Sequence, residues 1–140
     1  MNNNAESSNY GQGEASFNAA GGFEGIKQLV DAFYDAMETR PQAQRIRDMH
    51  SPNLDESRDK LTRFLAGWLG GPREYASRYG PMSIPQVHKH LRVDETERDM
   101  WLLCMKQAID QQPYSLSFKT YLLQQLSHPA ERVRQVSEGR

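Results

Sequence analysis

Residues 58–72 read RDKLTRFLAGWLGGP, and this stretch has both a helical periodicity and a clear helix end. Its apolar side chains recur three or four residues apart, at Leu61, Phe64, Leu65 and Trp68, which is the spacing of one face of an α-helix. The Gly-Gly-Pro that follows stops a helix, because glycine accepts the left-handed conformation after the last turn and proline cannot continue the hydrogen bonding. The stretch therefore predicts a helix with one buried face.

The start of this helix is predicted at Asn53. Asparagine is a favoured N-cap residue, and Glu56 stands three residues later, where its side chain can cap in return. Leu54 and Ser57 would continue the buried face toward this end of the helix.

The chain before this helix has the same periodicity. Residues 24–39 predict a longer helix, which Pro41 ends because a residue that precedes proline is pushed out of the helical region. A short helix is expected over 42–48. The apolar stripe of the longer helix consists of Ile26, Leu29, Val30, Phe33, Tyr34 and Met37.

The chain after the glycine pair predicts a short helix over 73–79 and two long helices. Asp94 and Glu97 have the spacing of a second capping box, and Ser115 or Ser117 caps the last helix. No segment alternates with a period of two, so the fold class is all-α with about five helices. The inner faces carry Trp101, Cys104, Met105 and Ala108 on the first long helix, and Phe118, Tyr121, Leu122 and Leu126 on the second.

The length of 140 residues suits one domain. Residues 1–14 are rich in Asn, Ser and Gly and predict a flexible or loosely docked arm. The globular domain is expected over 15–128, and 129–140 is expected to form a charged tail that frays or extends into solvent.

Composition excludes several classes of function. The net charge is −1, from 17 basic and 18 acidic residues, which argues against a nucleic-acid partner because such a partner needs a basic face. No apolar run approaches the roughly 18 residues that span a membrane, and residues 1–4 do not resemble a secretory signal. The expected location is therefore cytoplasmic. Cys104 is the single cysteine, which excludes an intramolecular disulfide, a Cys-x-x-Cys zinc site and a Cys-x-x-Cys-His haem attachment.

Familiar catalytic motifs are absent, which leaves four histidines as candidates for chemistry: His50, His88, His90 and His128. Any single one is more often a surface or loop residue than a ligand. A haem needs only one protein nitrogen below the iron, together with an apolar slot between helices. Composition does not show whether such a slot exists.

Three motifs are specific enough to indicate a protein family. They are the stretch 58–72, the run Glu97-Arg98-Asp99-Met100-Trp101-Leu102-Leu103-Cys104-Met105, and Val30-Asp31-Ala32-Phe33-Tyr34 after a Gly-Gly pair. In order and spacing they resemble the truncated haemoglobins of the second group, and the resemblance covers roughly residues 20–126. It implies a globin-like, two-over-two helical sandwich around a non-covalently held haem b.

The resemblance also implies site residues. The iron ligand matches His88, and the gas side matches Tyr34, His50, Trp101 and Ser57. One departure leaves His90 as an alternative iron ligand: the family's loop before this histidine is rich in arginine, and here it has none. The haem-contacting positions match Leu61, Phe64, Lys60, Arg92 and Tyr75, of which the last three are expected near the haem propionates.

Three functions are compatible with these residues. The first is reversible binding of oxygen, nitric oxide or carbon monoxide, in which hydrogen-bond donors worth roughly 0.5–1.5 kcal/mol each slow the release of oxygen. The second is a haem enzyme, such as a nitric oxide dioxygenase or a peroxidase, that uses a separate reductase. The third is a haem-free or haem-sensing interaction module.

Overall fold

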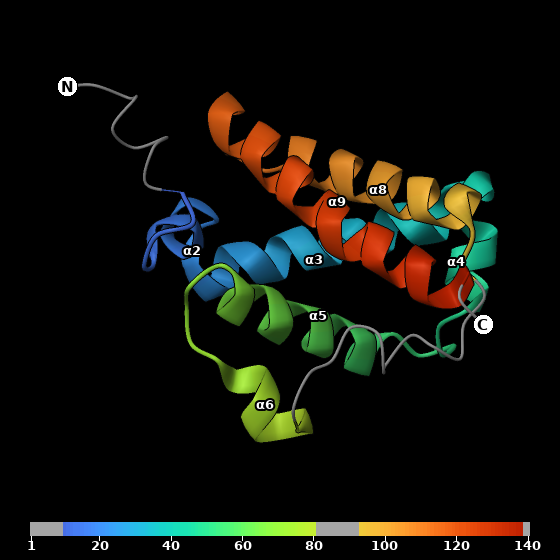
Figure 1. Ribbon diagram of the computed structural model, residues 1–140, viewed down its shortest axis with the longest axis horizontal. Helices are drawn as coiled ribbons and strands as arrows, with labels where there is room; N and C mark the ends of the chain where they lie inside the picture. The colour runs from blue at the N-terminus through green and yellow to red at the C-terminus, as the bar shows by residue number, and fades with distance from the viewer. Residues whose placement is uncertain (1–9, 81–92, 139–140) are drawn as a thin grey trace.

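The computed structural model describes residues 10–80 and 93–138, and these form an all-α fold (Figure 1). In both ranges every regular element is a helix, as the periodicity predicts. No helix of the described chain is long and apolar enough to cross a membrane. The elements in order are α2 (Ala15–Ala19), α3 (Gly22–Thr39), the 3-10 turn η1 (Pro41–Ala43), α4 (Gln44–Asp48), α5 (Asp55–Trp68), α6 (Glu74–Tyr79), α8 (Glu95–Asp110) and α9 (Leu116–Glu138).

The long helices form two pairs, α3 with α5 and α8 with α9, and α3 also packs against α8 (Figure 1). The core consists mainly of buried residues from α3, α5, α8 and α9. Burying each large apolar side chain there stabilises the fold by about 1.5–3 kcal/mol. The largest fully buried side chains include Phe33, Phe118, Ile26, Leu29, Met37, Met105, Ile109, Leu122 and Leu126.

Two of the predicted helix starts are confirmed. Asp94 and Glu97 form a capping box, in which the Asp94 amide donates to the Glu97 side chain over 2.8 Å. Ser115 Oγ accepts a hydrogen bond from the Phe118 amide at 3.2 Å. Both caps satisfy backbone N–H groups that a helix end leaves without a partner.

The capping box predicted at Asn53 and Glu56 is wrong. The Asn53 side-chain oxygen accepts a hydrogen bond from the Asp55 amide at 2.8 Å, two residues on, and the helix begins at Asp55. This local turn takes the place of the cap because the intervening Leu54 is buried in the core.

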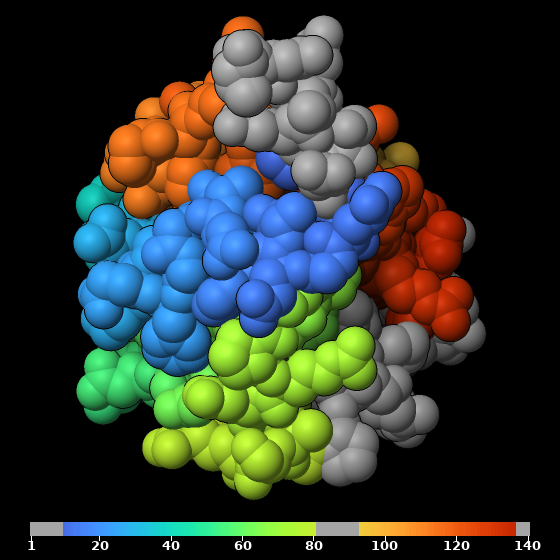
Figure 2. All heavy atoms as spheres, turned by 90° about the vertical axis from the view of Figure 1, so that its left-hand side faces the viewer, coloured from blue at the N-terminus to red at the C-terminus, as the bar shows by residue number. Residues whose placement is uncertain are grey.

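The glycine pair after α5 allows a close approach of the chain. A Cβ on Gly70, which has a φ of 98°, would overlap the carbonyl oxygen of Gly13, and one on Gly71 would overlap the ring of Phe17. The Phe17 amide also donates to the Leu69 carbonyl over 3.0 Å. Figure 2 shows the resulting contact between the N-terminal end of the described chain, in blue, and the light green segment that follows α5.

The fraying predicted from Pro129 onward is wrong for the described residues, since α9 continues through this proline to Glu138. The end of α9 is tied to α8 by an ion pair of 2.7 Å between Glu131 and Arg98, and Arg134 also binds Glu131 at 2.6 Å. These contacts offset the backbone hydrogen bond that proline removes.

Candidate functional site

The two helix pairs leave an interior surface that protein covers only in part. Among the described elements, α5 has its extensive contacts with α3 and α6 and none comparable with α8 or α9. Leu61 and Phe64 on α5 are only half-buried against the core, as are Met100 and Trp101 on α8. Apolar side chains left half-covered on two helices that do not pack together fit a flat apolar group such as a haem.

The apolar face predicted for α5 divides into two stripes. Thr62, Leu65 and Ala66 are buried. Leu61 and Phe64 lie on the neighbouring, half-buried stripe. Trp68, expected on the buried face, is 37% exposed and stacks on Phe64 with ring centroids 6.3 Å apart. Its placement inside the core is therefore wrong.

Tyr34 and His50 are in contact. The rings are 5.6 Å apart and nearly perpendicular, and Tyr34 is 5% exposed. Burial raises the pKa of the Tyr34 phenol, more than the Arg58 guanidinium 5.5 Å from its ring lowers it. The Tyr34 hydroxyl therefore keeps its proton at neutral pH and can donate a hydrogen bond.

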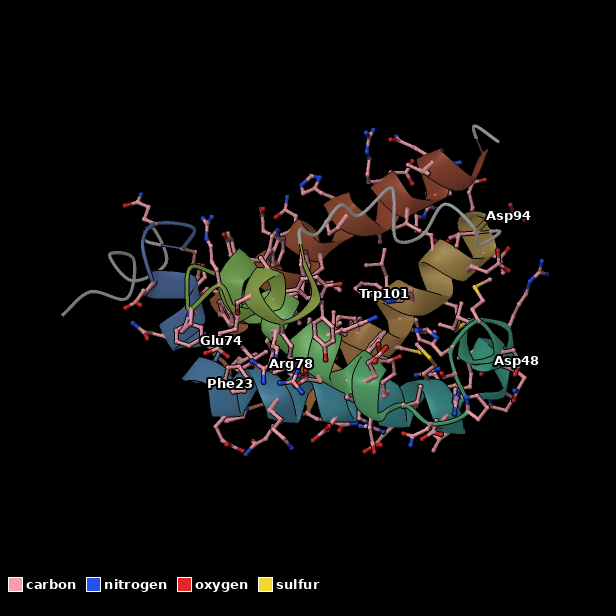
Figure 3. The ribbon with its side chains drawn as sticks, turned by 90° about the horizontal axis from the view of Figure 1, so that it is seen from below. Phe23, Asp48, Glu74, Arg78, Asp94 and Trp101 are labelled. Atoms are coloured by element: carbon pink, nitrogen blue, oxygen red, sulfur yellow. The ribbon has the colours of Figure 1, made fainter. Side chains whose placement is uncertain are left out.

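Trp101 joins this pair through Phe33. The Phe33 ring lies 5.0 Å from Tyr34 and 5.1 Å from Trp101, edge-on to both. Figure 3 shows Trp101 near the middle of α8. Phe33 was predicted only as a core residue, and its position in the same apolar stripe as Tyr34 was the available signal.

His50 is oriented by the short helix before it. Nδ1 lies 2.9 Å from the carbonyl oxygen of Ile46, and since a carbonyl can only accept, Nδ1 must donate its proton there. In the neutral ring Nε2 then carries a lone pair and accepts hydrogen bonds. His50 donates from Nε2 only when the ring is protonated. The sequence led us to expect a hydrogen-bond donor at His50, and the structure restricts that role to the protonated ring.

Lys60 and Tyr75, two of the three residues predicted near the propionates, lie where α5 meets α6. Lys60 Nζ lies 3.2 Å from Glu56 and 5.2 Å over the ring of Tyr79, and Tyr75 packs beside that ring at 5.2 Å. Ser57, predicted on the gas side, is half-buried one turn before Leu61 on α5. His88, its alternative His90, and Arg92 lie outside the described residues.

Tyr79 and Asp59 are further residues of this region that the sequence analysis did not single out. The Tyr79 hydroxyl donates to Asp59 at 2.5 Å, and Arg63 binds the same carboxylate at 3.0 Å. The Tyr79 and Arg63 hydrogen bonds lower the pKa of Asp59. Arg63 also reaches Glu74 at 2.6 Å, so α6, whose Glu74 and Arg78 are labelled in Figure 3, is fixed to α5 by charge.

The chain belongs to the bacterial-like globins, since the model of that family matches residues 15–134. Within them it is a truncated haemoglobin of the second group, and the fold predicted from the sequence, a two-over-two globin, is confirmed. The globin family implies a haem cofactor, and the half-covered apolar surface between the helix pairs fits one.

Individual relatives agree with this assignment. Group 2 truncated hemoglobin YjbI of Bacillus subtilis (strain 168) is 35% identical over 98 residues, which make up 68% of this chain and 72% of that protein. The group II 2-on-2 hemoglobin of the plant pathogen Agrobacterium tumefaciens has a TM-score of 0.80 at 29% identity, covering 85% of this chain and 92% of that one. The truncated oxygen-avid haemoglobin from Bacillus subtilis has a TM-score of 0.76 at 29% identity, covering 84% and 97%.

Proposed function

We propose that this chain binds a diatomic gas, above all oxygen, reversibly at a non-covalently held haem b. In this proposal His88 is the iron ligand, and Tyr34, His50, Trp101 and Ser57 lie on the gas side. The haem iron supplies the position at which the gas coordinates. The similarity to the truncated oxygen-avid haemoglobin from Bacillus subtilis supports a diatomic ligand.

The observation that carries the proposal is the contact between the buried Tyr34 and the half-buried His50. The Tyr34 phenol keeps its proton, so it can donate to a ligand that gains negative charge. In the neutral ring His50 has only an acceptor at Nε2, so the donor to the ligand in this pair is the Tyr34 hydroxyl. Because the Tyr34 side chain is buried, a hydrogen bond from its hydroxyl is stronger than one at the surface.

Residues of α5 and α6 would hold the haem itself. Leu61 and Phe64 supply half-covered apolar surface for the ring system. Lys60 and Tyr75 lie near one another beside Tyr79 and would meet the propionates, with Arg92. Lys60 would exchange its exposed Glu56 partner for a propionate, and an exposed ion pair of this kind costs less than about 1 kcal/mol to give up.

The acceptor at His50 Nε2 also supports a second candidate function, the reduction of peroxide. A neutral imidazole can take up a proton from hydrogen peroxide and return it to the leaving oxygen. Two electrons and two protons per peroxide, giving two waters, would have to come from a separate reductase.

Absorption spectra test the haem and its ligand. The oxidised, reduced and carbon monoxide forms of the wild type are expected to show a Soret band that shifts when carbon monoxide binds. His88→Ala should weaken or alter this band, and His90→Ala is the matched control that should not. The absence of a band after addition of haem would contradict the proposal, and a normal band in His88→Ala would transfer the ligand role to His90.

The oxygen release rate tests the gas side. Tyr34→Phe should release oxygen up to about tenfold faster, because one hydrogen bond contributes about 0.5–1.5 kcal/mol and 1.4 kcal/mol is tenfold. Tyr114→Phe is the matched control, since the Tyr114 hydroxyl donates to the Ala20 carbonyl over 3.1 Å elsewhere in the core. Equal release rates for wild type and Tyr34→Phe would rule out the donor role of Tyr34.

A further inference from the structure

Glu97 is a carboxylate buried inside the first turn of α8. Its side chain is 3% exposed, and its Oε1 accepts the Asp94 amide at 2.8 Å. A buried charge is costly unless it is paired and hydrogen-bonded. The capping bond uses one of the two carboxylate oxygens, so the other must have a partner from elsewhere in the fold.

That partner is Arg45, which lies on α4. Its Nε is 3.0 Å from Glu97 Oε2, while the arginine side chain remains 64% exposed. The two oxygens of Glu97 therefore have different tasks: one caps α8, and the other binds the short helix that leads to His50. Figure 3 shows Asp48, at the end of α4, and Asp94, just before α8, at the same end of the molecule.

The interface between α4 and α8 is otherwise incompletely packed. A hollow of about 170 Å³ lies there, lined by Gln42, Arg45, Ile46, Asp94, Thr96, Glu97 and Met100. A five-residue helix such as α4 is not stable in isolation and takes its position from tertiary contacts. Ile46 anchors α4 in the core, and the Arg45–Glu97 ion pair joins α4 to α8.

Each residue of this ion pair is connected to a residue of the gas side: Arg45 to His50, and Glu97 to Trp101. Ile46 follows Arg45 directly, and its carbonyl oxygen holds His50 at Nδ1. Glu97 and Trp101 are four residues apart, so they lie on the same face of α8. We infer that Arg45 and Glu97 are positioning residues, which fix His50 relative to Trp101 and thereby set the rate of gas release. This inference rests on the proposed function.

Hydrogen exchange tests the positioning without relying on haem. In the haem-free and haem-loaded protein, Arg45→Met should speed the exchange of amides 44–50 about three- to tenfold, since the ion pair that joins α4 to the buried Glu97 carboxylate has been lost. Arg45→Lys, which keeps the charge, should restore part of the protection. Lys106→Met is the control, because it removes an exposed ion pair within α8. Exchange at the wild-type rate in Arg45→Met would overturn the inference.

The consequence for gas binding is read from the C–O stretching band of the carbon monoxide complex and from the oxygen release rate. Arg45→Met should shift or split the band and change the release rate several-fold, as should Glu97→Gln, which can still accept the Asp94 amide. Tyr34→Phe in the same series separates the two proposals. If Tyr34→Phe moves the band while Arg45→Met and Glu97→Gln leave it unchanged, the inference fails and the proposed function stands. If none of the variants moves it, both fail.

Discussion

The inner face of α3 and the inner face of α5 have the same periodicity in the sequence, but the structure covers them differently. On α3, residues such as Phe33 and Leu29 are completely buried against neighbouring helices. On α5, Leu65 is buried, while Leu61, one turn away, remains half-exposed. The difference teaches that apolar periodicity marks a face without specifying what covers it. The half-covered stripe of α5 is where a haem fits.

Paired Leu→Ala substitutions on α5 are the largest test of this comparison. Leu65→Ala should lower the free energy of unfolding of the haem-free protein by about 2–5 kcal/mol, because it creates a cavity in the core. Leu61→Ala should lower the free energy of unfolding of the haem-free protein much less, and it should instead speed the loss of haem. Urea unfolding followed by circular dichroism measures the first effect, and haem transfer to an acceptor globin measures the second. Equal losses of stability in the haem-free protein would remove the distinction between the two stripes.

A smaller effect is expected at the glycine turn, which fixes the end of α5 against α2. Gly70→Ala adds a methyl group where the Gly13 carbonyl oxygen lies and should cost about 1–3 kcal/mol of overpacking in addition to the strain of its positive φ. Gly22→Ala is the matched control, since Gly22 also has a positive φ, of 70°, but has open space around its Cβ position. The midpoint of thermal unfolding should be well below that of Gly22→Ala in the Gly70→Ala variant. Equal midpoints would mean that the close approach contributes nothing.

The sequence predicted the helices well because their signals are local. The capping box at Asp94 and Glu97 lies within four residues, and the structure contains it. The same pattern at Asn53 failed because the burial of Leu54, a tertiary effect, decides how that turn is made. The continuation of α9 could not be predicted, since it depends on an ion pair between residues that are 33 positions apart.

The site was less predictable than the fold. The resemblance to a family placed Tyr34, His50 and Trp101 together, and periodicity alone would have left two of them as core residues. The orientation of His50 depends on the Ile46 carbonyl, and Glu97 and Arg45 meet only through the tertiary fold. These are tertiary contacts between separate elements, and no short sequence motif predicts them.

The smallest effect is expected at the C-terminal end of α9. There the ion pairs of Glu131 with Arg98 and Arg134 hold the helix. Hydrogen bonds from Arg134 and Arg98 lower the pKa of Glu131 from 4.5 to about 2. A carboxyl whose pKa is lower in the folded than in the unfolded state stabilises the fold above pH 4.5, and this contribution is lost as the pH falls through about 2. Glu131→Gln should therefore be less stable than the wild type above pH 4.5, and the difference in stability should shrink between pH 4.5 and 2.

Urea unfolding midpoints across this pH range measure the difference in stability. Glu95→Gln is the control, because Glu95 is 4.0 Å from Arg98 and largely exposed. A difference between Glu131→Gln and wild type that stays constant with pH would mean that the end of α9 is held by packing and not by the carboxylate.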